Sequence, residues 1–457
     1  MNAVLRPRRV AIVGAGPSGL FAAQSLLSRD QDVRIDVLDR LPTPFGLLRY
    51  GVAPDHTSIQ AMQPKLAEPF RSERTRFFGM VEFGSTLTRA DLLASYDAVI
   101  YAAGASEDRR LGVDGEDLPG SRSARQFVAW YCGHPDAQPQ SLDGVRSAMT
   151  FGVGNVAVDV ARVLSVSSSH LAGTDMPPEV LEELDRAQVS DVWLVGRRGP
   201  QHASFTTTEL RELLELPGVQ PLIDPADLAG IDPATLDRRT RTNVEALTAA
   251  TGRVVPDAHT RLHLLFWRRP VRLLGDGAVE AVVLERTTLD ASGAVIATGE
   301  QETIEAQLVL RAIGYRGRPL PDVPFDDRAG VIPNAEGRVT DLDGRLCPGE
   351  YVVGWIKRGP IGVIGTNKSD AAATVAALLE DFAANPRFPD GPDAAELLAA
   401  RGIEASTFED WERIDAEERA RGTREGRARV KVASWHQLTD LIRHGRGGGP
   451  LEREQEC

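Results

Sequence analysis

Three closely spaced glycines, Gly14, Gly16 and Gly19, follow an apolar segment that begins at Val10, and Asp39 ends the next apolar segment. An apolar strand that enters such a turn and continues as a helix matches the pattern that binds the diphosphate of a dinucleotide. We expect Gly14 to form the tight turn, Gly16 to let the backbone approach the anion, and Gly19 to let the helix pack closely. The helix N-terminus presents free N–H groups to the anion. Asp39 can accept hydrogen bonds from ribose hydroxyls, so this site suits NAD or FAD.

A second glycine motif, Gly152-Val153-Gly154, follows another apolar segment and leads into residues of helical character, with Ala157 at the third glycine position. The next predicted strand, residues 191–195, is followed by Arg197 and Arg198 where an NAD site has a carboxylate. Two guanidinium groups suit a 2′-phosphate. We therefore predict an NADP(H) site here, with a surface arginine pair as the alternative.

The elements that position these motifs predict an α/β fold with two Rossmann-like dinucleotide-binding domains. Residues 96–105 form an apolar segment that ends in small residues, and residues 308–315 repeat this pattern. Both fit places where the chain crosses between two domains. We predict that residues 1–105 and 331–457 form an FAD-binding domain, and that residues 106–330 form an NADP-binding domain inserted between its two parts.

Four further segments have recognisable character. Alternating apolar residues and glycine turns in residues 263–304 predict a small antiparallel β excursion. Residues 165–190 are expected to form a loop and a short helix, and residues 409–425 an exposed charged helix. The glycine-rich tail from His444 onward is expected to be disordered.

Length and composition indicate an ordinary globular protein of more than one domain. The chain has 457 residues, 42% hydrophobic and 26% charged. Its formal net charge of −13 argues weakly against nucleic-acid binding. No apolar run approaches the roughly 20 residues of a membrane helix. The three scattered cysteines form no metal-binding or redox pair, and the first strand leaves no room for a signal peptide, so we expect a cytoplasmic protein without a metal site.

Several segments, taken together and in order, resemble the adrenodoxin reductase-like ferredoxin–NADP⁺ reductases. The resemblance covers nearly the whole chain and weakens in the last 30 or so residues. It rests on Pro44–His56, Ala124–Tyr131, Gly154–Arg162, Val192–Pro200, Phe205–Leu216 and Gly354–Thr366. Asp39 departs from the family pattern, because many members have glutamate there.

The resemblance implies two cofactors, FAD and NADP(H), and assigns contacts to each of them. Its implied FAD contacts are Ser18, Asp39, Leu47, Val81, Trp355, Gly362, Val363 and Ile364. Its implied NADP(H) contacts are Arg109, Asn155, Val156, Ala157, Val158, Arg197, Arg198 and Glu209, with Gly362 at the nicotinamide end.

The resemblance also implies a catalytic pair beside the flavin, His56 and Glu209. Hydride transfer needs no general base, so His56 would manage a proton on the reduced flavin or hold the nicotinamide, and Glu209 would polarise it. Each of these two residues also has a purely structural interpretation. A lone histidine is often a loop or core residue, and a carboxylate near a helix start often stabilises the helix end.

The implied activity is hydride transfer from NADPH to FAD, followed by transfer of single electrons to an iron–sulfur ferredoxin, with the direction of flow left open. Arg238, Arg239 and Arg241 are candidates for docking this acidic partner, with a solvated helix face as the alternative. Other acceptors remain open, as in a monooxygenase or a glutamate synthase subunit, although the cysteine-rich region of that subunit is missing here. A non-catalytic flavoprotein sensor is the remaining alternative.

Overall fold

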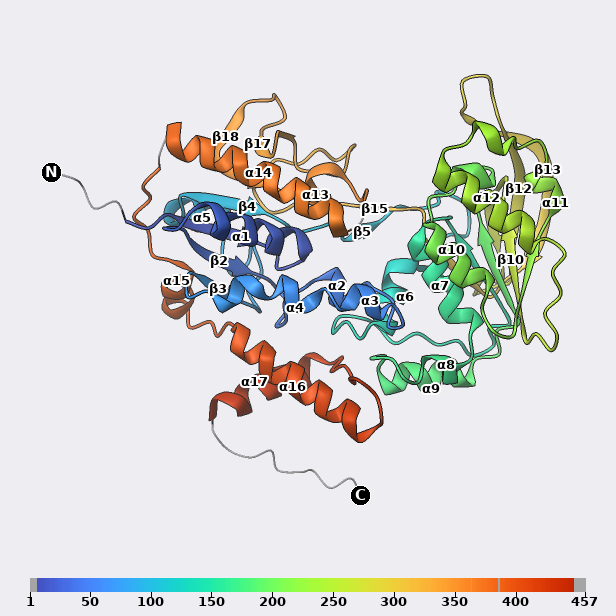
Figure 1. The fold of residues 1–457 in the computed structure, drawn as a ribbon, viewed down its shortest axis with the longest axis horizontal. Helices are drawn as coiled ribbons and strands as arrows, with labels where there is room; N and C mark the ends of the chain where they lie inside the picture. The colour runs from blue at the N-terminus through green and yellow to red at the C-terminus, as the bar shows by residue number, and fades with distance from the viewer. Residues whose placement is uncertain (1–5, 363, 385–386, 448–457) are drawn as a thin grey trace.

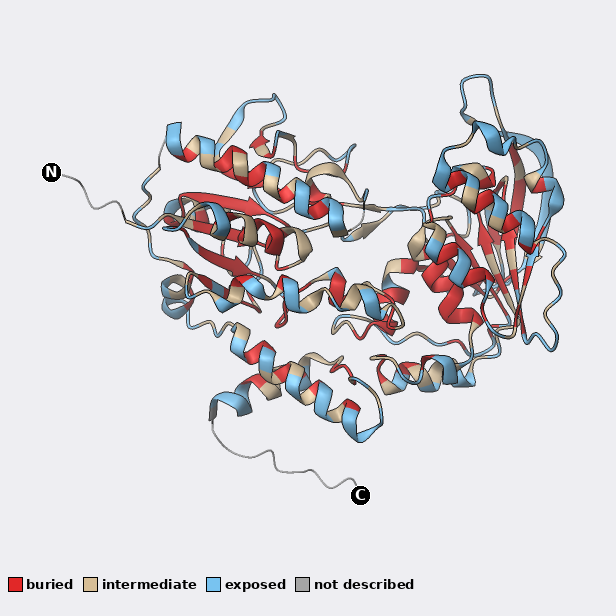
Figure 2. Cartoon of the chain, viewed as in Figure 1, coloured by how far each residue is buried: buried red, intermediate tan, exposed pale blue. Residues whose placement is uncertain are grey.

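The computed structural model describes residues 6–362, 364–384 and 387–447. It contains two lobes, each built around a largely buried β-sheet (Figures 1 and 2). The first lobe holds a seven-stranded sheet in the order β16-β17-β18-β4-β1-β2-β3. Its strands are β1 (Arg9–Val13), β2 (Arg34–Leu38), β3 (Thr75–Phe78), β4 (Ala98–Tyr101), β16 (Asn334–Ala335), β17 (Arg338–Thr340) and β18 (Leu346–Val352).

The second lobe holds a six-stranded sheet in which every neighbouring pair is parallel, in the order β6-β14-β7-β8-β10-β9. Its strands are β6 (Ser121–Ser123), β7 (Ser147–Phe151), β8 (Asp191–Val195), β9 (Val219–Ile223), β10 (Thr260–Leu265) and β14 (Leu308–Arg311). Parallel strands covered on both faces consist of nearly continuous apolar residues, as in β1, β4 and β7. The predicted α/β fold with two Rossmann-like sheets is confirmed.

Helices pack around both sheets, and in the second lobe an antiparallel sheet packs against the parallel sheet as well (Figure 1). In the first lobe they are α1 (Pro17–Arg29), α2 (Leu47–Tyr50), α3 (Thr57–Gln60), α4 (Gln63–Leu66), η1 (Glu68–Arg71), α5 (Arg89–Ser95), α13 (Trp355–Arg358), α14 (Ile364–Ala384), α15 (Ala394–Ala400), α16 (Phe408–Arg424) and α17 (Trp435–Gly447). In the second lobe they are α6 (Ala124–Tyr131), α7 (Asn155–Ser165), α8 (Ser168–Leu171), α9 (Pro178–Arg186), η2 (Pro200–His202), α10 (Thr207–Leu214), α11 (Pro225–Leu228), η3 (Pro233–Thr235) and α12 (Arg238–Ala250).

The chain passes between the two lobes through a short antiparallel pair, β5 (Glu107–Asp108) and β15 (Tyr315–Arg316). Tyr315 pairs with Asp108, and Arg316 pairs with Glu107. Each strand follows one of the two similar segments of the sequence, since β5 comes after β4 and β15 comes after β14. The two passages therefore lie side by side between the lobes (Figure 1).

The predicted antiparallel excursion is a three-stranded sheet of β11 (Arg268–Leu274), β12 (Ala281–Leu289) and β13 (Val295–Glu305). The prediction was wrong for residues 263–265, which belong to the parallel strand β10. Residues 165–190 contain two short helices, α8 and α9, where one was expected.

Two expectations for the C-terminal region were wrong. The helix α16 is not simply exposed, because Trp411, Ile414 and Glu418 lie on one face and are buried. Residues 444–447 belong to α17, which buries Leu438 and Ile442 one turn apart. The rest of the tail that was expected to be disordered, from residue 448, lies outside the described residues. Among the described residues, no helix combines the length and apolarity needed to cross a membrane. The expected cytoplasmic location stays a prediction.

A buried ion pair joins α16 to α2. Arg49 donates two hydrogen bonds to Glu418, at 2.5 and 3.0 Å, and both side chains are almost completely buried. Glu418 also accepts from Arg429 at 2.8 Å and from the Val432 amide at 2.9 Å. Burial opposes ionisation of Glu418, but Arg49 outweighs it and lowers the pKa of the carboxyl. The stabilisation is therefore present above the unfolded-state pKa of about 4.5 and is lost as the pH falls through the folded-state pKa.

We expect Glu418→Gln to reduce the free energy of unfolding by about 3–5 kcal/mol, because it leaves the Arg49 charge buried without a counter-ion. Urea unfolding followed by circular dichroism measures the change. Glu412→Gln is the matched control, because Glu412 is an exposed glutamate of the same helix and should shift stability by less than about 0.5 kcal/mol. Equal unfolding midpoints for the two variants would contradict the prediction.

Candidate functional site

The first glycine turn is shaped by close contacts at two of its three glycines. Gly14 has φ of +114°, and a Cβ there would lie 2.5 Å from the carbonyl oxygen of Ala102. A Cβ on Gly19 would collide with the Gly14 carbonyl oxygen and lie 3.1 Å from Cγ2 of Ile12. A Cβ on Gly16, by contrast, would meet no heavy atom within 4 Å. The backbone is thus open at Gly16, where we expected a diphosphate to approach.

The helix α1 begins beside this open position. Gly16 is its N-cap, and no side chain caps the free N–H groups of the first turn. These groups and the helix dipole form a ready site for an anion. The geometry fits the diphosphate of a dinucleotide.

Asp39 forms hydrogen bonds within the protein, in addition to its predicted contact with a ribose. Its carboxylate accepts hydrogen bonds from the backbone N–H groups of Ala15, at 2.8 Å, and Leu41, at 2.9 Å. Burial raises the pKa of Asp39, although both hydrogen bonds oppose the shift. A carboxylate oxygen has a second lone pair, so acceptance from a ribose hydroxyl stays open to Asp39.

The segment from Pro44 to His56 folds over the first glycine turn. The Phe45 amide donates to the Ala15 carbonyl at 2.8 Å, and a Cβ on Gly46 would lie 3.1 Å from Cα of Gly16. Phe45 is buried with φ of +83°, a conformation that side chains rarely adopt. Sequence reasoning did not single out this turn. Leu47, the next residue after Gly46, is 41% exposed.

The other predicted flavin contacts lie on α13 and the turn that follows it. A Cβ on Gly354 would lie 2.7 Å from Cβ of Ser18, so the start of α13 packs against the first glycine turn. The Trp355 indole N–H is buried without a hydrogen-bond partner, and Ile361, just before Gly362, is 73% exposed. An apolar ring system with polar edges fits this combination of an exposed aliphatic side chain and an unpaired donor.

The remaining predicted flavin contacts differ in their exposure. The Val81 side chain is buried, and its backbone N–H donates to the Asp39 carbonyl at 2.9 Å. Gly362 is exposed with φ of +91°, and Ile364 begins α14. Val363 lies outside the described residues.

The second glycine turn repeats the geometry of the first. Gly152 has φ of +128°, and a Cβ there would collide with the carbonyl oxygen of Ala312. Gly154 is the N-cap of α7 and again provides no side-chain cap. Ala157 is fully buried, which fits a small residue at the third position. The side chain of Asn155 accepts from the Thr206 amide at 2.8 Å and so ties this turn to the start of α10. Val156 and Val158 follow it in the first turns of α7.

Arg197 and Arg198 follow β8 directly and are exposed, as is Arg109 on the passage between the lobes. In the part of the chain that the structure describes, none of the three guanidinium groups forms an ion pair with an acidic side chain. Their charges are thus available to an external phosphate, as the NADP(H) prediction requires.

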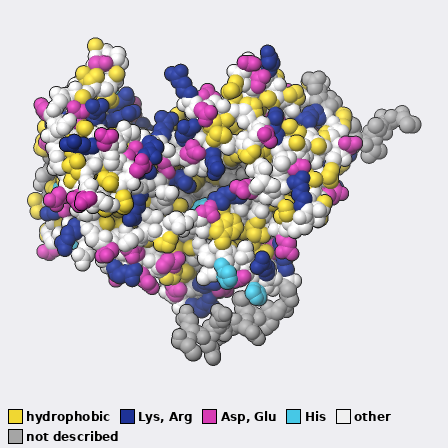
Figure 3. Space-filling view, turned by 180° about the vertical axis from the view of Figure 1, so that it is seen from behind, with side chains coloured by type: hydrophobic (Ala, Val, Ile, Leu, Met, Phe, Trp, Pro, Cys, Tyr) yellow, Lys and Arg dark blue, Asp and Glu magenta, His cyan; other side chains and the backbone are white. Residues whose placement is uncertain are grey.

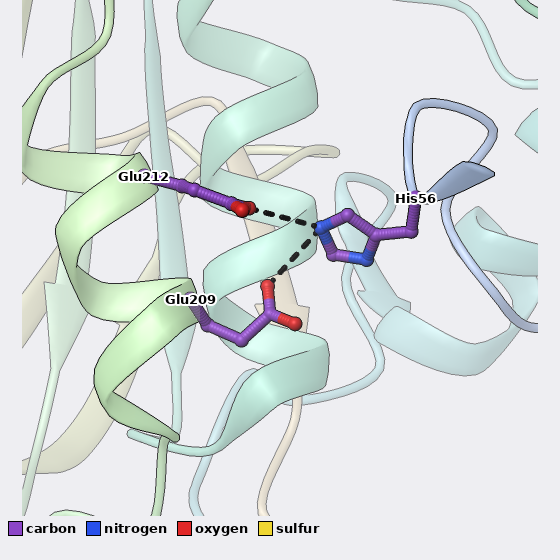
Figure 4. Close-up of side chains that lie close together, drawn as sticks. All are labelled: His56, Glu209 and Glu212. Atoms are coloured by element: carbon purple, nitrogen blue, oxygen red, sulfur yellow. Dashed lines mark ion pairs between the residues drawn. The ribbon is translucent and has the colours of Figure 1, made fainter. Parts of the chain in front are cut away.

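His56 lies between the lobes and contacts acidic residues of the second lobe (Figure 4). Its Nε2 atom is 3.2 Å from Oε2 of Glu209 and 3.4 Å from Oε2 of Glu212, both on α10. Its Nδ1 atom is 3.6 Å from Oδ1 of Asp159 on α7. The structure therefore brings together the predicted pair, His56 and Glu209, from segments about 150 residues apart.

The charges around His56 favour its protonated form. Burial disfavours the imidazolium, but Glu209 and Asp159 outweigh this effect and raise the pKa of His56. Burial raises the pKa of Asp159 to about 6, against the opposing charges of Arg162 and His56. Arg162 bonds to Asp159 at 2.7 Å and also pairs with Asp55. This buried network can hold a proton near Nε2 and fix the orientation of the imidazole.

Sequence reasoning missed two members of this group, Asp159 and Glu212. The spacing of Glu209 and Glu212 on a predicted helix was the available signal, since residues three apart share a helix face. Asp159 is likewise close to the start of a predicted helix. Neither could be paired with His56 without the long-range packing of the two lobes.

Two glycine turns that each begin a helix lie on separate sheets, with a histidine–glutamate pair between them. This is the arrangement expected of an oxidoreductase with two dinucleotide sites. The family model of the NAD(P)-binding Rossmann-like domain matches residues 12–61. NADPH-ferredoxin reductase FprA of Mycobacterium tuberculosis is 46% identical over 465 residues, covering 97% of this chain and all of the relative. Human mitochondrial NADPH:adrenodoxin oxidoreductase is 40% identical over 459 residues, covering 95% of this chain and 92% of the relative.

The comparison with solved structures leads to the same relatives. The structure of Mycobacterium tuberculosis FprA in complex with NADPH matches with a TM-score of 0.90 and 46% identity, covering 97% of this chain and all of that one. The chain belongs to the family of NADPH-ferredoxin reductases and NADPH:adrenodoxin oxidoreductases.

We expect Gly16→Ala to weaken FAD binding at least tenfold while leaving the stability of the apoprotein nearly unchanged. The added methyl group meets no protein atom but occupies the space over the turn. Equilibrium titration of the apoprotein with FAD, followed by flavin fluorescence, measures the affinity. Gly173→Ala is the matched control, because a Cβ at Gly173 also meets nothing within 4 Å. Equal FAD affinity in both variants would show that the diphosphate does not lie at Gly16.

Proposed function

We propose that this protein is an FAD-dependent NADPH:ferredoxin oxidoreductase. The contact of His56 with Glu209 carries the proposal, because it joins the lobe of the first glycine turn to the lobe of the second. FAD, when bound, supplies the chemistry, since it accepts a hydride from NADPH and gives up electrons singly. The family membership supports both cofactors and an iron–sulfur acceptor.

The proposal includes two domains that bind different cofactors. Residues 1–105 and 331–457 would hold FAD through the turn at Gly14–Gly19, Asp39 and the start of α13. Residues 106–330 would hold NADP(H) through the turn at Gly152–Ala157 and the two arginines after β8. The strand composition of the two sheets supports this division.

His56 and Glu209 would position the reacting rings rather than act on the hydride. The imidazole, held at Nδ1 by Asp159 and at Nε2 by Glu209, has a fixed orientation and a raised pKa. It can therefore donate a proton or a hydrogen bond at Nε2. Because both side chains are about nine-tenths buried, they also help to exclude water between the lobes.

The proposal is tested by anaerobic titration of the holoenzyme with NADPH, followed by an oxidised [2Fe–2S] ferredoxin. We expect NADPH to bleach the flavin absorbance and ferredoxin to restore it over many turnovers. Bleaching without reoxidation by ferredoxin would overturn the acceptor but keep the nucleotide chemistry. A flavin that NADPH fails to bleach would overturn the enzyme proposal.

We expect Arg197→Ala to raise the KM for NADPH about 30- to 1000-fold and to leave the KM for NADH nearly unchanged. Removing a charged contact to the 2′-phosphate costs about 2–4 kcal/mol, and NADH lacks this group. Steady-state kinetics with ferricyanide as acceptor separate the two cofactors. Arg71→Ala, an exposed arginine far along the chain from β8, serves as the control. Equal losses with both cofactors would contradict the 2′-phosphate assignment.

The docking of the acidic partner is proposed at the start of α12. Arg238, Arg239 and Arg241 are exposed there, and Arg241 also donates to the carbonyls of Pro233 and Leu236, both at 2.9 Å. Cations at a helix N-terminus oppose the helix dipole, so their clustering is not explained by helix stability. Seen from behind, further Lys and Arg side chains lie around the hollow between the lobes (Figure 3).

We expect Arg239→Glu to raise the KM for ferredoxin roughly tenfold at low salt, because a rim charge mainly affects the rate of encounter. The rate with ferricyanide should not change, since that acceptor needs no protein interface. Arg71→Glu tests whether any exposed charge reversal has the same effect. The docking site would be wrong if both reversals raised the ferredoxin KM equally.

A further inference from the structure

His56, Glu209 and Glu212 form a cluster with the composition of a metal site. The carboxylates come from one face of α10, three residues apart, and the imidazole comes from the segment before α3. One ligand atom from each residue lies within 4.8 Å of the others. Figure 4 shows both carboxylates directed at the same imidazole nitrogen.

The two separations that involve His56 match the edges of a tetrahedral zinc site. Zinc binds histidine nitrogen at about 2.0–2.1 Å and carboxylate oxygen at about 2.0–2.2 Å, so two tetrahedral ligand atoms lie roughly 3.3–3.5 Å apart. The Nε2 atom of His56 lies 3.2 Å from the Glu209 oxygen and 3.4 Å from the Glu212 oxygen. One ion could therefore bind all three atoms with small side-chain movements.

The contact between His56 and Glu209 is poorly aligned for a hydrogen bond. The Nε2 atom of His56 and the Oε2 atom of Glu209 face each other at 3.2 Å in side chains that are nine-tenths buried, yet they form no well-aligned hydrogen bond. An ion between the two atoms would replace this poorly aligned contact with a bond to each of them.

The surroundings of His56 also suit a metal ligand. A ligating histidine usually has its other ring nitrogen oriented by a carboxylate, and Asp159 lies 3.6 Å from Nδ1. Asp159 is itself fixed by Arg162 at 2.7 Å. This order of carboxylate and imidazole directs Nε2 toward Glu209 and Glu212, where an ion would bind.

We propose that His56, Glu209 and Glu212 bind a divalent zinc ion that reversibly inhibits the enzyme. Two carboxylates neutralise the charge of the ion, and three protein ligands leave one coordination position for water. The ion would occupy Nε2 of His56 and tie α10 to the segment before α3. The imidazole could then neither donate at Nε2 nor move apart from Glu209, so turnover with NADPH would slow until the metal is removed.

Zinc binding is measured on the purified holoenzyme by competition with a chromophoric zinc chelator near pH 7. We expect one zinc ion per chain, and we expect Glu212→Gln to weaken binding at least tenfold. Glu215→Gln is the matched control, because Glu215 is an exposed glutamate at the end of the same helix and is not part of the cluster. It should bind zinc as the unsubstituted protein does.

His56→Gln is the second variant, and it should lose stoichiometric zinc binding. Its flavin content shows whether the variant is folded. NADPH–ferricyanide activity of the unsubstituted enzyme should fall as the site fills and return with EDTA. The absence of a one-to-one complex, or equal zinc affinity in the Glu212→Gln and Glu215→Gln proteins, would overturn the site. Because binding is measured without turnover, this result is independent of the identity of the electron acceptor.

Discussion

The close approach of a strand-end carbonyl to a glycine determines the geometry of both nucleotide turns. The Ala102 carbonyl occupies the position that a side chain on Gly14 would need, and the Ala312 carbonyl does the same at Gly152. Each alanine directly follows a strand, β4 or β14, and from each the chain continues toward the other lobe. The connection between the lobes therefore starts beside each glycine turn. This arrangement places the two predicted nucleotide sites near the passage formed by β5 and β15.

The segment from Pro44 to His56 contacts three separate parts of the chain. Its turn at Phe45 packs on the first glycine turn, Arg49 pairs with Glu418 of α16, and His56 reaches α10 of the other lobe. A strained turn and a buried ion pair both cost free energy unless the surrounding packing fixes them. Here they fix a single segment against three parts of the chain, so that the imidazole is held at a defined place between the lobes.

Much of the fold could be predicted because its determinants are local. The glycine turns at Gly14 and Gly152 depend on backbone conformation and neighbouring residues, and the sequence shows both. The strands β4 and β14 are apolar segments that end alike, and each is followed by a strand of the passage between the lobes, β5 or β15. The pairing of His56 with Glu209 was available through family resemblance, and the structure places the two side chains in contact.

Features that depend on long-range packing could not be predicted. The charged sequence of α16 suggested an exposed helix. Its residue Glu418 is buried because it pairs with Arg49 and Arg429, which lie elsewhere in the chain. The glycines after His444 suggested disorder, although Leu438 and Ile442 bury one face of α17. Glu212 and Asp159 joined the site through the contact between lobes, which no local pattern encodes. Asp39 was expected to face a ribose, and its bonds to Ala15 and Leu41 were not foreseen.

The narrow covalent connection between the lobes has a mechanical consequence. A two-stranded pair such as β5–β15 is weak by itself, so side-chain contacts must contribute to the orientation of the lobes. Several of these contacts are ionic: Arg162 with Asp55, Arg40 with Asp136, and Lys431 with Asp175 at 3.1 Å. Salt screens exposed ion pairs far more than buried ones. Of the three pairs only Arg40 with Asp136 is exposed, so added salt will weaken this one contact between the lobes and leave the two buried pairs nearly intact.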